Sequence, residues 1–461
     1  MKRQPLAKTI AAVSAGLSAL LINSPVSAQG YYVDEQSALR LGDAFSGGAA
    51  SASDASAAYY SPAAMLLVRD ELAINLAAIS VRSELNGSAE TGDGSVPING
   101  DDAEADNFDF LPTLYFVRNL SEGFSAGAFI NAPYATGTDF GDDSIARYQT
   151  TESEITGIDA GLSLAFRVHE KVSIGGSIIA QYMNAKTAVA INTAALCLGA
   201  EAAGDLGPYT CSGLGIDPAE LGNNTYDGSF VMEGHNTAFG FSLGTLVEFT
   251  PSSRLGLNYR TRIAHELTGS ATVEFPAAAS GFTGLAGLDN TKADGRVQFV
   301  TPESANISYF HQLGDLSLQA DASWTKWSRF DKLQVESNNS TVAALAAEPQ
   351  VYDWSESQRF ALGANYKLSP QLTLRGGFAL DMTPIDKDKT KIDFAFDDYK
   401  AISLGMSYVL TEAMTLDVGY QHTMTQKRDI DQNDLLTAGA RLHGEVTTEV
   451  NSFAAGLRWA L

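Results

Sequence analysis

The sequence is poor in basic residues and in cysteine, and both shortages exclude some classes of function. Lys and Arg number 30 against 54 Asp and Glu, which gives a formal net charge of −24. A nucleic-acid-binding protein draws affinity from Lys and Arg that meet phosphate, so this balance excludes that class. The 461 residues include two cysteines and six histidines, with no C-x-x-C, no zinc-ligand spacing and no H-E-x-x-H. We therefore expect neither a metal site nor a cofactor.

Long apolar runs are also scarce. After the first 28 residues the chain has no apolar stretch long enough for a membrane helix, which needs about 20 residues. A helical membrane protein is thereby excluded. A membrane β-barrel is not excluded, because its strands alternate polar and apolar residues, and the mean hydropathy of −0.05 fits that average.

The N-terminus reads as an export signal. Three basic residues precede the apolar residues 10–22, and a small-residue cleavage site ends at Ala28. We expect residues 1–28 to be a signal peptide that is removed on export from the cytoplasm. Since the exported protein meets an oxidising compartment, Cys197 and Cys211 are expected to form a disulfide within one long connection.

From residue 71 onward the dominant pattern has period two. Between Leu372 and Leu380 one phase is largely apolar and the other is small or polar, which is typical of a half-buried strand. No helical period of comparable length appears. The same alternation recurs in residues 158–168, 172–182, 239–249, 255–263, 316–324, 360–368, 402–410, 414–420 and 452–461.

The connections alternate between short and long. Tight links are expected at 120–123, 169–171, 251–254, 314–315, 369–371 and 411–413, and long links near 86–109, 138–146, 193–228, 276–294, 338–353, 386–397 and 429–443. They join fourteen strands over residues 71–461, an all-β antiparallel transmembrane β-barrel in the bacterial outer membrane. Aromatic residues expected in its interfacial girdles are Tyr182, Tyr259, Trp324, Tyr366, Tyr408 and Tyr420.

Residues 29–70 do not read as strand. Small residues crowd the run from Gly47 to Ser53, and Ser61-Pro62-Ala63 follows a Tyr59-Tyr60 pair. The segment carries too much apolar surface to stay solvated as a tail. We expect it to fill the barrel lumen as a hatch, or plug.

Several motifs carry a family resemblance. They are residues 34–38, 41–47, 54–56 and 61–65 in the N-terminal part, and residues 322–330, 359–363 and 378–384 in the later strands. Together they resemble the FadL family, outer-membrane transporters of long-chain fatty acids and related hydrophobic compounds. Ser61 stands where the family usually has Asn, residues 392–398 depart from the family's loop pattern, and Leu461 replaces the usual terminal Phe.

The resemblance implies a mechanism without an energy source. The ligand binds in an outer groove of the loops and then in a lumen pocket beside the hatch, and a hatch shift with a kink in the third strand opens a sideways route. Here that strand is expected at 125–136 and contains Asn131, Pro133 and Tyr134. Because proline removes a ladder hydrogen bond, Pro133 marks either the wall defect or simply the end of the strand.

Ligand contacts are expected from two kinds of residue. Phe45, Tyr59 and Met65 are candidates for the pocket lining, and Arg147, Lys326 or Arg329 for the partner of a ligand carboxylate. The resemblance implies transport of long-chain fatty acids; the alternatives are uptake of aromatic hydrocarbons by the same mechanism and the function of a general diffusion porin. Outer-membrane lipid and lipopolysaccharide are the expected surroundings of a monomer.

An enzyme is not expected. Gly123-Phe124-Ser125-Ala126-Gly127 matches the G-x-S-x-G pattern, but that motif needs Ser on a turn from strand into helix. Here a tight turn leads into a predicted strand.

Overall fold

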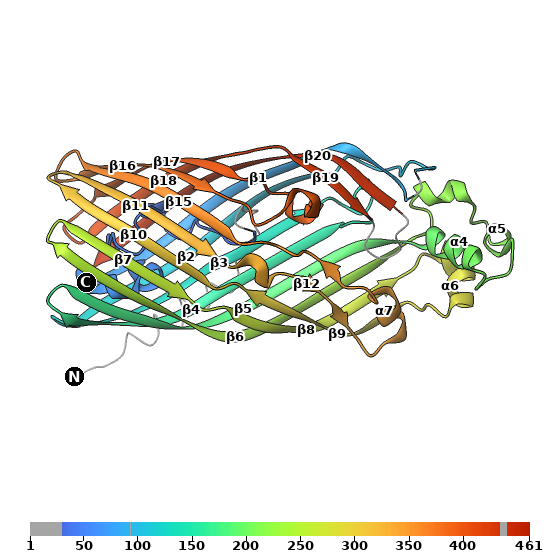
Figure 1. Cartoon of the computed structure of the whole chain (residues 1–461), viewed down its shortest axis with the longest axis horizontal. Coiled ribbons are helices and arrows are strands. Elements are labelled where there is room, and N and C mark those ends of the chain that lie inside the picture. Colours follow the sequence, from blue (N-terminus) through green and yellow to red (C-terminus); the bar gives the residue numbers. More distant parts are fainter. Residues whose placement is uncertain (1–29, 93, 434–439) are drawn as a thin grey trace.

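The computed structural model describes residues 30–92, 94–433 and 440–461. They form a closed barrel of fourteen antiparallel strands (Figure 1). The first strand, β1 (Glu71–Thr91), pairs with β2 (Glu104–Ser121) on one side and with the last strand, β20 (Ala440–Ala460), on the other. This pairing closes the sheet, as lipid requires. The predicted signal peptide lies outside the described residues.

Four of the barrel strands are interrupted and consist of two pieces each. Pro302, which has no backbone N–H to donate, lies at one of these interruptions. The interrupted strands are β7 (Ser253–Arg260) with β8 (Ile263–Glu274), β9 (Thr291–Thr301) with β10 (Ser304–Leu313), β11 (Leu316–Thr325) with β13 (Val335–Glu336), and β18 (Met414–Thr425) with β19 (Arg428–Asn433). The continuous ones are β3 (Phe124–Asp139), β4 (Glu152–His169), β5 (Val172–Asn192), β6 (Asp227–Thr250), β15 (Ser357–Lys367), β16 (Leu372–Asp381) and β17 (Tyr399–Val409).

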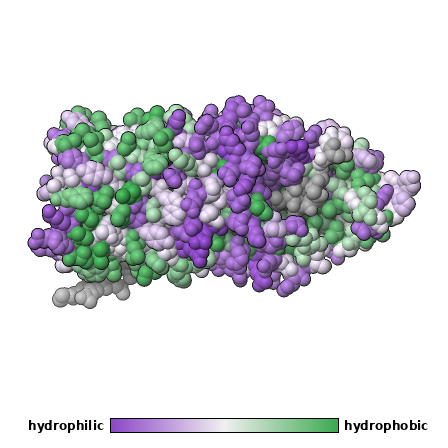
Figure 2. All heavy atoms as spheres, viewed as in Figure 1, coloured by the Kyte–Doolittle hydropathy of each residue, from purple (hydrophilic) through white to green (hydrophobic). Residues whose placement is uncertain are grey.

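The outer face of the barrel carries an apolar belt. Outward side chains such as Leu162, Ile178 and Phe239 are 71%, 70% and 72% exposed. Figure 2 shows apolar residues gathered on the half with the short turns, while hydrophilic residues cover the middle of the molecule. Only lipid makes such an exposed apolar belt favourable. Because the belt covers only the half with the short turns, the strands extend beyond the membrane on the loop side. Of the predicted girdle residues, those exposed on this outer face are Tyr182, Tyr259, Tyr366 and Tyr408.

The strands are longer than the alternation alone predicts. The predicted long link at 86–109 is wrong in its bounds, because β1 continues to Thr91 and β2 starts at Glu104. Similarly, β6 begins at Asp227 instead of near Phe239. Above the membrane both faces of a strand meet water, so the ladder continues while the apolar and polar phases fade.

Residues 30–70 contain short helices and no barrel strand: α2 (Ala38–Leu41), α3 (Ala57–Tyr60) and the 3₁₀ turn η1 (Pro62–Leu67). The segment is almost entirely buried against inward-facing groups of the barrel. For example, the Ala49 N–H donates to Ser308 Oγ at 2.9 Å, and the Ser163 hydroxyl donates to the Ala58 carbonyl at 2.7 Å. A Cβ on Gly256 would meet the Ala49 carbonyl oxygen at 1.9 Å, so glycine lets the two backbones touch.

The long loops form two groups, one that caps the end of the barrel and one that folds into the lumen. One group forms a helical cap at the loop end (Figure 1), where the disulfide Cys197–Cys211 packs with Ile216 and Phe282. It contains α4 (Thr193–Ala203), α5 (Thr210–Gly213), η2 (Pro218–Gly222), η3 (Ala277–Ala279) and α6 (Ser280–Ala286). None of the helices within the described ranges has the length and hydropathy of a membrane-spanning helix.

The other group of loops folds inward. Residues 326–356 and 382–398 bury Trp327, Phe330, Trp354 and Phe394 in one aromatic cluster with Tyr31. Their elements are η4 (Trp327–Arg329), β12 (Lys332–Leu333), α7 (Ser340–Leu345), β14 (Gln350–Val351), η5 (Lys387–Lys389) and η6 (Ile392–Phe394). These loops form one wall of the main cavity.

Candidate ligand-binding site and wall opening

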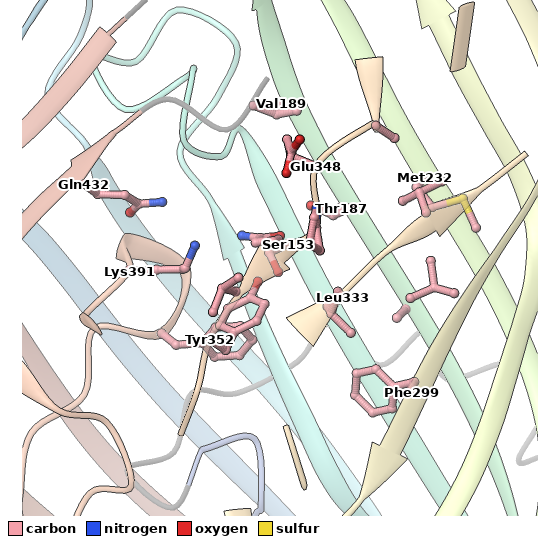
Figure 3. A pocket seen from close by; sticks show the side chains of 18 of the residues that line it. Ser153, Thr187, Val189, Met232, Phe299, Leu333, Glu348, Tyr352, Lys391 and Gln432 are labelled. Carbon is pink, nitrogen blue, oxygen red and sulfur yellow. The ribbon is translucent and has the colours of Figure 1, made fainter. Parts of the chain in front are cut away.

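A hollow inside the barrel, here called the main cavity, has a volume of about 510 Å³. Its barrel wall comes from inward-facing positions of β4, β5, β6, β8 and β9, where period-two alternation places apolar side chains on one face. Figure 3 shows Met232 and Phe299 on this side, with Leu333 from β12 beside them. Further apolar lining residues are Ile155, Val189, Phe230, Leu267, Val297 and Val335.

The opposite wall of the main cavity is polar and comes from the infolded loops and from β19. Lys391, Tyr352 and Gln432 lie together on this side (Figure 3). The Lys391 ammonium lies 5.1 Å from the centre of the Tyr352 ring, a cation–π contact. The cavity is therefore amphipathic, with an apolar barrel wall facing a polar wall that carries both acidic and basic side chains.

Lys391 differs from the other cations of this cavity in its partners. Lys186 Nζ lies 2.6 Å from a Glu152 oxygen, and Lys389 Nζ lies 2.6 Å from an Asp353 oxygen. The Lys391 ammonium makes no hydrogen bond or ion pair with any residue of the described ranges. Burial lowers the pKa of Lys391, although the nearby Asp393 carboxylate acts in the opposite direction. Burial in turn raises the pKa of Asp393, which accepts a 3.0 Å hydrogen bond from the Tyr352 hydroxyl.

A smaller space, the inner cavity, lies between residues 30–70 and the barrel wall and measures about 100 Å³. Phe45, Tyr59 and Tyr134 line it together with two arginines, Arg260 and Arg359. Phe45 and Tyr59, which the sequence suggested as pocket lining, border this inner cavity, and their contact with a ligand stays a prediction. Met65 is fully buried against the barrel wall and lines neither cavity.

The wall is interrupted between β2 and β3. Their paired residues end at Leu114 and Ile130, and beyond this level β4 is the only barrel strand within the described ranges that pairs with β3. The register of β3 against β4 shifts between Asn131 and Tyr134, where Ala132 and Pro133 oppose a single β4 residue. The strand then continues to Asp139, so the alternative that Pro133 merely ends it is wrong.

The N-terminal segment supplies the partners that β3 lacks at this level. The Val33 N–H donates to the Pro133 carbonyl and the Ala135 N–H to the Tyr31 carbonyl, both at 2.9 Å. The Gln36 side chain donates to the Ala132 carbonyl at 2.9 Å and accepts from the Ala132 N–H at 3.1 Å. Residues 31–36 thus cover the gap from inside, as an additional strand would.

The comparisons with known proteins identify the family. The model of the family described as outer membrane protein transport protein (OMPP1/FadL/TodX) matches residues 19–460. The chain belongs to this family. This FadL-family protein is an outer-membrane transporter of hydrophobic compounds and not an enzyme.

Individual relatives of this FadL-family protein cover almost its whole length. A long-chain fatty acid transport protein of Escherichia coli O6:H1 is 26% identical over 435 residues, which span 91% of this chain and 92% of the relative. The crystal structure of a Pseudomonas aeruginosa FadL homologue superimposes with a TM-score of 0.82 at 24% identity, covering 94% of this chain and 99% of that one. The Ralstonia pickettii toluene transporter TbuX gives a TM-score of 0.64 at 18% identity, covering 94% and 99%.

The three basic residues suggested from sequence lie elsewhere. The Arg147 side chain is fully buried among the loops, where its Nε donates to Asp227 at 2.7 Å. Arg329 forms an ion pair with Glu303 at 2.8 Å, and Lys326 precedes it in the chain. None of the three lines the main or the inner cavity. Sequence reasoning missed Lys391, although it flanks residues 392–398, where the chain departs from the family's loop pattern.

Proposed function

We propose that this FadL-family protein takes up long-chain fatty acids by passive diffusion. The observation that carries the proposal is the main cavity, in which an apolar barrel wall faces the half-buried Lys391 ammonium. Its volume of about 510 Å³ falls in the usual range for ligand pockets. Burial of an alkyl chain contributes about 0.8 kcal/mol for each methylene. The carboxylate of a fatty acid would supply the hydrogen-bond acceptor that the Lys391 ammonium lacks among the described residues.

The head group distinguishes a fatty acid from an aromatic hydrocarbon. Toluene would fill the apolar part of the main cavity and offer the Lys391 ammonium no hydrogen-bond acceptor. Desolvation of an uncompensated ammonium is costly, whereas a fatty acid carboxylate offsets it with a charge-assisted hydrogen bond. The cation in the cavity therefore favours fatty acids over the hydrocarbons of the alternative reading.

The route out of the lumen runs sideways between β2 and β3. Residues 31–36 act as a gate, since they hold the unpaired part of β3 through backbone and Gln36 hydrogen bonds. When this part of the hatch moves inward, the gap between the two strands connects the lumen to the outer-membrane lipid. The ligand then stays in apolar surroundings, so no energy source is needed. A general diffusion porin would need an open lumen, whereas residues 30–70 are packed against the inner wall.

Direct binding measurements test the substrate class. Oleate and toluene are titrated separately into the purified protein in lipid nanodiscs, and the same cells with and without the gene are tested for growth on each compound. We expect saturable oleate binding with at least tenfold higher affinity than toluene, and gene-dependent growth on oleate. Tighter binding of toluene, or a large stable conductance in planar bilayers, would contradict the proposal.

A further inference from the structure

One aromatic ring, that of Tyr31, packs against a lining residue of each cavity. The Tyr31 ring centre lies 5.3 Å from that of Phe299, which lines the main cavity. On its other side it lies 5.7 Å from the ring of Tyr134, which lines the inner cavity and belongs to the β3 kink. The Tyr31 hydroxyl donates to the Val300 carbonyl at 3.0 Å. The inner cavity thus lies between the main cavity and the proposed wall opening.

Arg260 is a buried cation of the inner cavity with unused donors. Its side chain is only 6% exposed, and its Nη1 donates to Asp159 Oδ2 at 2.6 Å. The other two nitrogens, Nε and Nη2, are buried and make no hydrogen bond of good geometry to a described residue, although the Tyr134 hydroxyl interacts with the guanidinium. The Tyr134 and Tyr59 rings lie 5.7 and 5.9 Å from the guanidinium carbon and hold it between them. A buried charged donor without an acceptor is destabilising, so the unused donors of Arg260 call for an explanation.

The unused edge of Arg260 is the one that grips carboxylates elsewhere in this chain. Arg441 uses Nε and Nη2 on Asp431 at 2.6 and 2.5 Å, and Arg458 uses the same two nitrogens on Asp417 at 2.5 and 3.1 Å. This parallel fork matches the two oxygens of a carboxyl group. In Arg260 the fork is free for a ligand because Asp159 occupies the remaining nitrogen.

The other charges that line the inner cavity have partners within the protein. Arg359 Nε lies 3.0 Å from Asp34 Oδ2. Asp321 accepts hydrogen bonds from Asn306 at 2.6 Å and from the Ser308 hydroxyl. The lining contains two carboxylates, Asp34 and Asp321. Asp34 faces Arg359, and Asp321 faces Asn306 and Ser308, instead of Arg260.

We propose that Arg260 forms a second binding station, which takes the carboxyl head group of the ligand after it leaves Lys391 and before it reaches the gap between β2 and β3. This inference rests on the proposed function. The head group moves past Tyr31 and accepts hydrogen bonds from Arg260 Nε and Nη2, while its alkyl chain still occupies the main cavity. At about 100 Å³ the inner cavity suits a head group and not a whole fatty acid. Arg260 thereby keeps the head group hydrogen-bonded during its passage through the buried inner cavity.

The variant Arg260→Lys tests this station. Lysine keeps the positive charge beside Asp159 and lacks the planar fork. We expect the rate of oleate uptake by cells to fall about tenfold, the effect of losing a hydrogen bond to a charged group. The affinity of the main cavity for oleate, measured in nanodiscs, should stay within about twofold of wild type, because Lys391 is intact. Uptake of oleyl alcohol, which has no carboxyl group, should fall much less.

A matched variant and a second ligand separate this role from a structural one. Arg296→Lys makes the same change on the outer face, where Arg296 pairs with Glu336 at 2.8 Å, and should leave uptake unchanged. Two results would overturn the proposal of a second station: an oleate uptake rate of Arg260→Lys equal to that of wild type, or an equal loss of uptake for oleate and oleyl alcohol. If wild-type protein binds no oleate at all, the proposed function itself fails, which is a distinguishable outcome.

Discussion

Replacing Lys391 by Met removes the ammonium of the main cavity and keeps an apolar stem of similar length. The ammonium has no hydrogen bond or ion pair within the described residues, so a bound carboxylate would be its direct acceptor. A hydrogen bond to a charged group contributes about 1.5–3 kcal/mol, which corresponds to about a 10- to 150-fold weaker Kd for oleate. Asp393 keeps its hydrogen bond from Tyr352 in this variant, so the loop retains its main polar contact.

Titration calorimetry in nanodiscs measures this change, with Lys186→Met as the matched control. Lys186 lines the same cavity but is already paired with Glu152 at 2.6 Å, so its loss should change the oleate Kd less than about fivefold, as for a partly exposed ion pair. Toluene binding should not weaken in Lys391→Met. An oleate Kd within twofold of wild type in Lys391→Met would refute the assignment of the head-group site.

The pH dependence gives an independent arm of the same prediction. Burial holds the pKa of Lys391 below its ordinary value of about 10.4. Anion binding favours the protonated form, so wild-type affinity for oleate should be constant below that lowered pKa and fall as the pH rises through it. The Met variant has no proton to lose at this position and should show no such fall. Equal losses in both proteins at high pH would assign the effect to another group.

Two further predictions concern the wall and the cap. Deletion of Pro133 removes the extra residue between Asn131 and Tyr134 and restores a regular ladder with β4, so it should abolish oleate uptake while the barrel still assembles. The control variant Pro133→Ala keeps the extra residue and should transport oleate nearly normally. Unchanged uptake by the deletion variant would argue against the lateral route. Replacement of both Cys197 and Cys211 by Ser should raise protease cleavage of residues 193–226 on intact cells, because the disulfide closes a loop of about 15 residues and contributes about 3 kcal/mol. The temperature of the barrel's thermal transition should not change. Protease resistance equal to that of wild type would mean that the apolar contacts around Phe282 are sufficient to stabilise the cap.

Much of the barrel follows from local pattern. Alternation over 372–380 or 402–410 fixes which side chains meet lipid, and the short turns between strands are read directly from Gly314-Asp315 or Ser369 to Gln371. Proline in a strand is unfavourable for a ladder, so Pro133 was recognisable as a defect. Its consequence was not, because the partners that residues 31–36 provide to β3 come from a segment about a hundred residues away in sequence.

The candidate site was less predictable than the fold. Arg147 and Lys391 are both basic residues in loops, and nothing local separates them. The difference lies in tertiary partners, since Arg147 meets Asp227 whereas Lys391 enters the lumen on an infolded loop. Arg260 reads as an ordinary strand residue, and only its contacts reveal that one edge of the guanidinium is unused.

The most direct test of the sideways route is a reversible lock on its gate. Tyr32 and Tyr134 face each other in an antiparallel bridge between the hatch and β3, so the double variant Tyr32→Cys/Tyr134→Cys can join them by a disulfide. Initial rates of oleate uptake are measured in cells before and after oxidation and again after mild reduction, with each single variant as control. The account predicts that oxidation stops uptake and reduction restores it, while oleate still binds to the main cavity. Uptake at an undiminished rate through the fully cross-linked protein would contradict it.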